Sequence, residues 1–442
     1  MNGSLLRSNY NFTPPTISHG QGATLFDEQG KNYIDGSSGA MVANLGHGNN
    51  TIAEAASDQI KKIAYTYRTQ FSNSPAEALA NKLITLAKDK SKVFFLSSGS
   101  EATEAAVRLT LQYWREIGLP TKRKILSRKI SYHGNTLGAL SLSADARRHS
   151  ISDITAFEPT VPPCYCYRCP KGLVPGTCNI ECADLLENSI LQTGPENVAA
   201  FITEPIIGAS GGAIVPHQQY MKRIRNICDK YNILLIVDEV ITGLGRTGEW
   251  FAMHHWKESS DITILGKGLN AGFTPLSAIL LNERVDEAIR TGTRQVSFGH
   301  THSGNPLSTA IALAVVEEIE RSNLVERSRI KGAELGKTLT GIGNQFDMIG
   351  DVRGIGMLWG IEFNQPDSQL TPYPKEFSMT DLVIKTAQKN GLIVYPCRGL
   401  INSTFGDAII VAPPLNSTDA ELDSLASRLY ETLSQVADVK LT

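Results

Sequence analysis

The feature that most constrains the fold is a pair of short apolar runs, each followed by charged side chains. ILLIV, at 233–237, is followed by Asp238 and Glu239, and ITIL, at 262–265, leads into Lys267 between two glycines. Runs of this length predict buried strands, and ligands in α/β sheets bind beyond the carboxyl ends of the strands. We therefore expect a carboxylate and a lysine to face each other across a bound cofactor.

This pairing suits pyridoxal phosphate. A lysine forms the Schiff base with this cofactor, and an aspartate keeps the pyridine nitrogen protonated. The plain alternative for Lys267 is an exposed lysine, which is the common case. However, the flanking sequence ILGKGLNAGF is apolar and glycine-rich, which is poor surface composition. A lysine buried there would have a lowered pKa, as imine chemistry requires.

Bulk properties exclude several classes of function. The chain has 442 residues and a formal net charge of −2, which gives no electrostatic case for nucleic acid or an anionic membrane as partner. No apolar run approaches the roughly 18 residues of a transmembrane helix. The N-terminal sequence lacks the apolar core of a signal peptide, so we expect a cytoplasmic protein with reduced thiols.

The pattern along the chain predicts an α/β protein with two domains. From about residue 93, apolar runs alternate with amphipathic helical segments, which favours a mainly parallel, doubly wound sheet covered by helices. We assign residues 61–310 to a large cofactor-binding domain. Residues 1–60, with a hairpin around EQGK, and residues 311–442 are expected to form a smaller α+β domain.

Two further segments suit an anion. SSGSEATEAA follows a strand and opens a helix, so Gly99 and Ser100 place backbone amides at a positive helix end. FGHTHSGNP precedes a helix and places His300 and Thr301 near its start. For each segment an ordinary helix start or polar loop is about as good an interpretation.

SYHGNT and TEP end two further predicted strands. Tyr132 could stack on a flat heterocycle, with His133 beside it and a glycine that lets the backbone approach, although a Tyr-His pair more often serves packing. Glu204 is expected to be buried and to meet either an arginine or the site, since buried carboxylates are rarely unpaired.

A glycine motif, G-x-G-x-x-G at Gly243, Gly245 and Gly248, superficially matches a dinucleotide fingerprint. That fingerprint requires a helix that opens within the motif and an acidic residue about 20 positions later. Neither is evident here, because GRTGEWFAMHHW has no clear helical period and the acidic residues precede the glycines. We therefore reject a dinucleotide site.

Taken together, SSGSEATEAA, SYHGNT, TEP, VDEVITGLGRTG, LGKGL and HTHSGNP resemble the class III (ω-amino acid type) aminotransferases of pyridoxal phosphate fold type I. The likeness covers roughly residues 20–415. It implies a large domain whose mainly parallel, seven-stranded type of sheet is sandwiched by helices. It also implies a homodimer with shared active sites.

The resemblance also implies roles for individual residues. Lys267 would bind the cofactor and move the proton, and Asp238 would bind the pyridine nitrogen. Tyr132 would stack on the ring, with His133 beside it, and Val240 would support the other face.

The remaining implied roles concern the phosphate and the substrate. Gly99 and Ser100 would hold the phosphate, joined by Thr301 of the neighbouring subunit. Glu204 would lie near the substrate pocket. Arg398, after a C-terminal strand in LIVYPCRGL, is our candidate for the substrate carboxylate, since a guanidinium can bind it with two hydrogen bonds; an exposed loop arginine is the alternative.

The implied reaction is a ping-pong transamination between an ω-amino acid or amine and a 2-oxo acid such as pyruvate. An aminomutase, racemase or decarboxylase could use the same site. A regulatory protein on an old enzyme scaffold is a third interpretation, which the intact Asp238 and Lys267 disfavour.

One segment departs from the family pattern. CYCYRCPKGLVPGTCNIECADLL carries five of the seven cysteines: Cys164, Cys166, Cys169, Cys178 and Cys182. Thiolates could bind zinc, but the spacing is irregular and a tetrahedral site takes four ligands. We expect no metal there and favour reduced, partly buried thiols over a disulfide or redox role.

Overall fold

The computed structural model describes residues 4–6, 9–10, 12–174, 176–366 and 370–439. Its central sheet has six strands in the described chain, and the strands are parallel except one, β9. In spatial order they are β4 (Lys92–Leu96), β9 (Ser277–Leu281), β8 (Ile262–Leu265), β7 (Leu234–Asp238), β6 (Val198–Thr203) and β5 (Lys124–Ser127).

The predicted mainly parallel sheet is thus confirmed. It has six strands where the resemblance implied seven. Beyond β5, a single parallel bridge between Arg128 and Val161 extends the sheet by one residue pair in the described chain.

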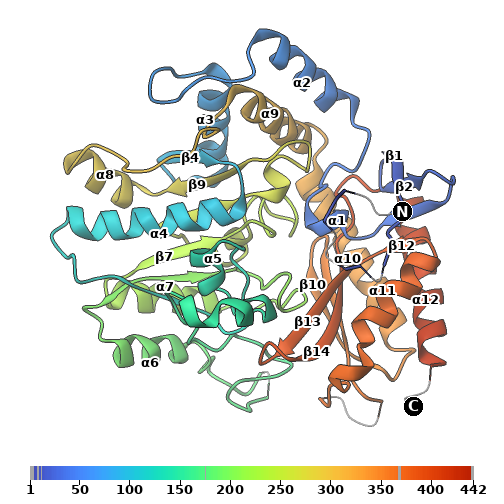
Figure 1. Cartoon of the computed structure of the whole chain (residues 1–442). Helices are drawn as coiled ribbons and strands as arrows, with labels where there is room; N and C mark the ends of the chain where they lie inside the picture. Colours follow the sequence, from blue (N-terminus) through green and yellow to red (C-terminus); the bar gives the residue numbers. More distant parts are fainter. Residues whose placement is uncertain (1–3, 7–8, 11, 175, 367–369, 440–442) are drawn as a thin grey trace.

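Helices cover both faces of this sheet (Figure 1). Leu234 and Ile236 of β7 pack in one core cluster with α4 (Gly99–Glu116) and α8 (Glu283–Thr291). Leu235 and Val237 pack in another with α6 (Asp184–Thr193) and α7 (Tyr220–Lys230). The run is apolar throughout because both faces of the strand are buried. Full burial of each such side chain stabilises the folded state by about 1.5–3 kcal/mol.

A second, antiparallel sheet belongs to the C-terminal part of the chain. Its order is β10 (Ile349–Ile355), β11 (Leu358–Phe363), β14 (Phe405–Val411) and β13 (Tyr395–Ile401).

A third sheet joins the two ends of the chain. β1 (Ile17–Gln21), β2 (Thr24–Asp27) and β3 (Asn32–Asp35) are followed in space by β12 (Leu392–Ile393), which pairs with β3 in parallel. The predicted hairpin around EQGK is confirmed by the antiparallel pairing of β2 and β3. Figure 1 shows the N-terminal strands beside the C-terminal elements. The domain boundaries at residues 60 and 310 stay predictions.

The remaining helices lie between the sheets and at the two ends of the chain. Asn73 caps the helix that begins at Ser74, because its side chain accepts the hydrogen bond from Ala76 N. Asn305 caps the helix after the HTHSGN loop, four positions beyond Thr301. These helices are α1 (Ser38–Met41), α2 (Asn50–Lys62), α3 (Ser74–Ala87), α5 (Leu137–Ser141), α9 (Pro306–Arg321), α10 (Leu324–Gly343), α11 (Met379–Lys389) and α12 (Asp419–Ala437).

Within the described ranges, no helix is both long and apolar enough to cross a membrane. Four short 3₁₀ helices lie in the connections: η1 (Ala146–Ile154), η2 (Ala252–Trp256), η3 (Lys267–Leu269) and η4 (Lys375–Phe377).

Two glycines of α10 lie in opposite surroundings. A Cβ added to Gly332 would lie 2.2 Å from backbone atoms of Gly356, in the turn between β10 and β11. A Cβ added to Gly341, on the same helix, would meet nothing within 4 Å. The close approach of helix and turn therefore requires glycine at the first position only.

Replacing these glycines should change stability in opposite directions. We expect Gly332→Ala to lower the free energy of unfolding by about 1–3 kcal/mol through overpacking. Gly341→Ala should raise it by up to about 1 kcal/mol through helix propensity. Denaturant unfolding measures both, and equal effects would contradict the tight contact at Gly332.

Candidate active site

Neighbouring parallel strands carry Asp238 and Lys267 to the same edge of the central sheet. Asp238 is the last residue of β7, and Lys267 begins η3 two positions after β8 ends. Lys267 has a left-handed backbone, with φ of 41°. Gly268 beside it leaves no room for a side chain, since a Cβ would lie 2.3 Å from Asn44 Nδ2. The predicted juxtaposition of the two strand ends is present.

Asp238 is buried and hydrogen bonded to His133. The Asp238 Oδ2 to His133 Nδ1 distance is 2.8 Å, and Asp238 Oδ1 accepts a hydrogen bond from Val240 N at 3.0 Å. His133 is itself fixed, because its backbone N–H donates to Ser143 Oγ and its backbone carbonyl accepts from Thr103 Oγ1. A carboxylate oxygen has a second lone pair, so Asp238 can accept a further bond from a protonated ring nitrogen.

Glu239, the other member of the acidic pair, is turned away from the cofactor site. Its carboxylate accepts hydrogen bonds from Ala252 N at 2.6 Å and Met253 N at 3.0 Å, at the start of η2. Burial raises the pKa of Glu239 to about 7. Of the two acidic residues, Asp238 therefore faces the candidate site, whereas Glu239 stabilises the backbone at the start of η2.

The amine of Lys267 is held in a poorly solvated place. Burial lowers the pKa of Lys267 to about 8, although the negative charges of Asp238 and Glu204 act in the opposite direction. In the part of the chain that the structure describes, no hydrogen bond or ion pair engages its Nζ. A substantial fraction of neutral amine at mildly alkaline pH is what imine formation needs.

Glu204 supports the site through backbone groups. Its carboxylate accepts from Tyr132 N at 3.1 Å and from Gly208 N at 2.8 Å, and burial raises its pKa. The expected arginine is present, but Arg128 donates to the Glu204 carbonyl oxygen rather than to the carboxylate. Glu204 thereby fixes the backbone from which Tyr132 and His133 project.

An anion cradle lies where α4 begins. Ser98 caps the helix and accepts from Glu101 N at 3.2 Å, while the Glu101 carboxylate accepts from Ser97 N at 2.8 Å. This exchange leaves the amides of Gly99 and Ser100 at the positive helix end, which favours a phosphate.

The cradle is packed closely against the rest of the site. A Cβ on Gly99 would lie 3.4 Å from the methyl groups of Val240. Ser100 Oγ accepts from Asn135 N at 2.9 Å. A Cβ on Gly134, whose φ is 135°, would collide with Ser100. The anion cradle, the carboxylate and the lysine thus fit the three reactive parts of pyridoxal phosphate.

Two predicted residues are not brought to this group within the single chain. Thr301 is exposed in the loop before α9, and Arg398 of β13 pairs with Asp381 of α11 at the surface. No described contact joins either residue to Lys267. Their roles toward a neighbouring subunit's phosphate and a substrate carboxylate stay predictions.

Two side chains that sequence reasoning missed lie beside Tyr132. The guanidinium of Arg147, in η1, lies 4.0 Å from the centre of the Tyr132 ring. Tyr395 of β13 is partly buried, and Arg147 and Tyr132 are among the groups that influence its pKa. Neither residue lies in one of the motifs that predicted the site, because Arg147 belongs to η1 and Tyr395 is the first residue of β13.

Arg246, within the glycine motif, is fully buried. Its guanidinium donates to the carbonyl of Met357 at 3.0 Å, to Asn44 Oδ1 at 2.6 Å, to Ser38 Oγ and to the carbonyl of Pro413. No helix begins within the motif, which the structure describes in full. Through Arg246, the motif connects segments that are distant in the sequence.

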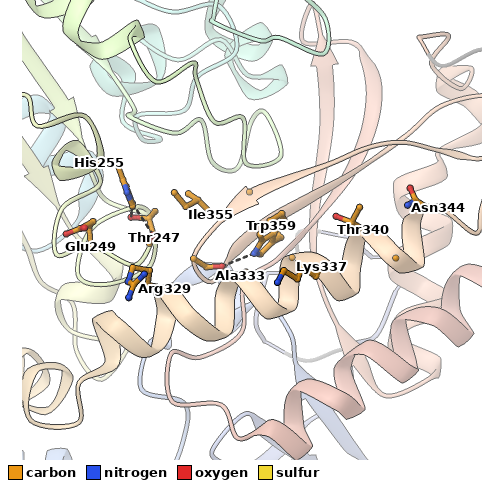
Figure 2. A pocket seen from close by; sticks show the side chains of 14 residues that line it. Thr247, Glu249, His255, Arg329, Ala333, Lys337, Thr340, Asn344, Ile355 and Trp359 are labelled. Carbon is orange, nitrogen blue, oxygen red and sulfur yellow. Dashed lines mark hydrogen bonds between the residues drawn. The ribbon is translucent and has the colours of Figure 1, made fainter. Parts of the chain in front are cut away.

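A separate cavity of about 830 Å³ lies between α10, the β10–β11 turn and the loop that follows β7. Figure 2 shows Arg329, Lys337 and Thr340 along α10, with Thr247 and His255 near Arg329 and Trp359 near Lys337. None of its lining residues is a predicted site residue. This cavity is therefore not the place of the proposed chemistry.

The five clustered cysteines converge on one small cavity of about 20 Å³, which His217 also lines. All of them are free thiols, and Cys164 and Cys182 are buried while the other three are half-buried. Among the described residues, no three His, Cys, Asp or Glu side chains are arranged to hold a metal ion.

The chain is similar to known proteins along nearly its whole length. The aminotransferase class-III family model matches residues 6–433. "Uncharacterized aminotransferase YodT" of Bacillus subtilis (strain 168) is 40% identical, covering 99% of this chain and 98% of that protein. A diaminobutyrate–2-oxoglutarate transaminase of Halomonas elongata is 33% identical, covering 96% of this chain and 90% of that protein.

Among solved structures, an amine transaminase from an uncultivated Pseudomonas species is similar, with a TM-score of 0.90 and 29% identity. The match covers 98% of this chain and 97% of that one, and that enzyme was solved in its PLP-bound form.

The lowered pKa of Lys267 predicts how cofactor binding depends on pH. Below about pH 8 the amine is mostly protonated, so the rate at which cofactor-free protein regains cofactor absorbance should rise with pH and level off above about 8. A lysine with an ordinary pKa of about 10.4 would keep gaining rate beyond pH 10. Stopped-flow absorbance distinguishes the two profiles, with Lys267→Ala as the blank.

The thiols should react in an order set by burial. Burial raises the pKa of Cys228 and of Cys397 to about 12, so both should react slowly with Ellman's reagent in the native protein. The half-buried thiols Cys169 and Cys178 should react first. In denaturant without reductant, all seven thiols should be titrated; a smaller number would reveal a disulfide.

Proposed function

Because the chain belongs to the class III aminotransferase family, a family of pyridoxal phosphate enzymes, we propose that it transfers the amino group of an ω-amino acid or amine to a 2-oxo acid such as pyruvate. The observation that carries this proposal is the meeting of Lys267 with the Asp238–His133 pair at two adjacent strand ends. The proposed acceptor follows the resemblance, while one relative is named for 2-oxoglutarate.

Each residue of the group has a chemical task. Bound pyridoxal phosphate supplies an electron sink for the substrate carbon. Lys267 would hold the cofactor, and its amine would carry a proton to and from that carbon. Asp238 holds the ring nitrogen protonated, and His133 fixes the orientation of the Asp238 carboxylate.

The other predicted residues orient the cofactor. We assign the phosphate to the amides and hydroxyl of Gly99 and Ser100, and the two faces of the ring to Tyr132 and Val240. Glu204 acts indirectly, because it holds the backbone amide of Tyr132.

We also propose a homodimer in which Thr301 completes the partner's phosphate site. Ile63, Tyr65, Tyr67 and Phe71, at and beyond the end of α2, are large apolar side chains that are 39–64% exposed. Tyr65 contacts the ring of His302, so this apolar surface adjoins the Thr301 loop. Exposed apolar surface of this kind is typical of protein interfaces.

Complementation tests the shared site. Thr301→Ala should weaken cofactor affinity about 10-fold, the loss of one hydrogen bond to a charged group. Mixing it with Lys267→Ala subunits should restore one complete site per mixed dimer, and with it high-affinity binding. Unchanged affinity of Thr301→Ala, or no recovery on mixing, would refute the shared site.

Product analysis tests the reaction itself. The wild-type enzyme should form alanine from pyruvate in the presence of an accepted amine, and Lys267→Ala should lose the cofactor absorbance band and turnover. Turnover of the donor without alanine from pyruvate or an amino product from another 2-oxo acid would favour an aminomutase, racemase or decarboxylase. Full turnover by Lys267→Ala would refute the site.

A further inference from the structure

The five clustered cysteines are a group of reactive side chains that the proposed transamination does not use. They line one cavity, and all of them are free thiols. Across the described ranges, no three of them are arranged to hold a metal ion. Contacts between pairs of thiols therefore decide what the cluster can do. The sequence pattern favoured inert thiols, because spacing alone could not show these contacts.

Three of the thiols form a chain of hydrogen bonds. The sulfur of Cys164 is hydrogen bonded to the thiols of both Cys166 and Cys182. The bond with Cys164 lowers the pKa of Cys182, although burial and the neighbouring cysteines act in the opposite direction. The bond with Cys164 raises the pKa of Cys166. Of these three thiols, Cys182 therefore most readily becomes a thiolate, the form that acts as a nucleophile.

The shared cavity limits which oxidants can reach Cys182. Cys164 and Cys182 are only 2% and 9% exposed. The cavity has a volume of about 20 Å³, which is enough for about one water molecule. Hydrogen peroxide is little larger than water, whereas an organic hydroperoxide or a small-molecule disulfide cannot enter without displacing the wall. The cavity therefore selects the smallest peroxide.

Both cysteines lie in parts of the segment that are already packed against each other. Cys164 and Cys182 belong to one core cluster with Leu186 and Ile190 of α6. Tyr165, next to Cys164, donates its hydroxyl to the buried carboxylate of Glu362 in β11. A bond between the two sulfur atoms therefore joins groups in contact and does not require the segment to unfold.

We propose that Cys182 and Cys164 form a modification site for hydrogen peroxide, in which Cys182 attacks the peroxide and Cys164 resolves the product. The Cys182 sulfur attacks one peroxide oxygen and the O–O bond breaks, which gives a sulfenic acid and one water molecule. The Cys164 sulfur then attacks the sulfenic sulfur, forms the disulfide and releases a second water molecule. Two thiols are thus oxidised by two electrons, the peroxide is reduced, and both thiol protons leave in water.

Peptide mapping of the cofactor-loaded enzyme tests the site. After treatment with hydrogen peroxide, the reduced enzyme should lose two of its seven thiols and yield peptides linked through Cys164 and Cys182. Dithiothreitol should restore both thiols, because a disulfide is reversible whereas sulfinic and sulfonic acids are not. tert-Butyl hydroperoxide has the same O–O bond but a bulky group, so at equal concentration and time it should leave this pair reduced.

Single variants separate the two roles. Cys164→Ser should stop the reaction at the sulfenic acid, which dimedone traps on Cys182. Cys182→Ser should abolish the linkage and the rapid reaction with hydrogen peroxide. Cys228→Ser is the matched control, because Cys228 is a buried free cysteine that does not line the cavity, and it should form the linkage like the wild type.

The inference is overturned if hydrogen peroxide links a different pair of cysteines in the wild type, or if Cys182→Ser is oxidised at the wild-type rate. Formation of the same linkage by tert-butyl hydroperoxide at an equal rate overturns it too. The peptide map of the wild type decides the pairing even where a variant does not fold. These outcomes are independent of the proposed transamination, because the cysteine pair shares no residue with the candidate active site.

Discussion

The buried hydrogen bond between Asp238 and His133 is the interaction on which the site depends. A carboxylate removed from water is costly unless it is hydrogen bonded, and here His133 Nδ1 and Val240 N supply the bonds. His133 is positioned in turn by Thr103 of α4 and by Ser143, just beyond α5. Asp238 therefore connects, through His133, the loop after β5 to α4 and to the residues just beyond α5.

A second buried charge ties this site to the ends of the chain. Arg246 binds the side chain of Asn44, and Asn44 in turn lies against Gly268, next to Lys267. Burial lowers the pKa of Arg246 to about 9. Its bonds to Ser38 and to the Met357 and Pro413 carbonyls connect N-terminal and C-terminal segments to one guanidinium. The turn that presents the lysine is thus held from outside the central sheet.

In the cysteine-rich segment, the cysteines and the residues between them make different contacts. Cys164, Cys166 and Cys169 line the small thiol cavity, whereas Tyr165 and Arg168 bind Glu362 of β11. Glu362 is fully buried and is also bound by Arg353 of β10. Tyr165 and Arg168 thereby join the cysteine-rich segment to the C-terminal sheet. The number of cysteines alone did not indicate this role.

Local pattern determined much of the fold. The run before Asp238 is apolar at every position, and the run before Lys267 at every position except Thr263, because a mainly parallel sheet covered on both faces buries both sides of its strands. Such a sheet brings neighbouring strand ends together, so the placement of Asp238 and Lys267 at one edge of the sheet could be predicted from the sequence, as could the helix start at Gly99 and Ser100. Only the tertiary structure placed Arg147 over Tyr132, paired Arg398 with Asp381 and buried Arg246 among distant carbonyls. These side chains sit in loops or on an edge strand, where no periodicity constrains direction and the partners are set by contacts between segments far apart in sequence.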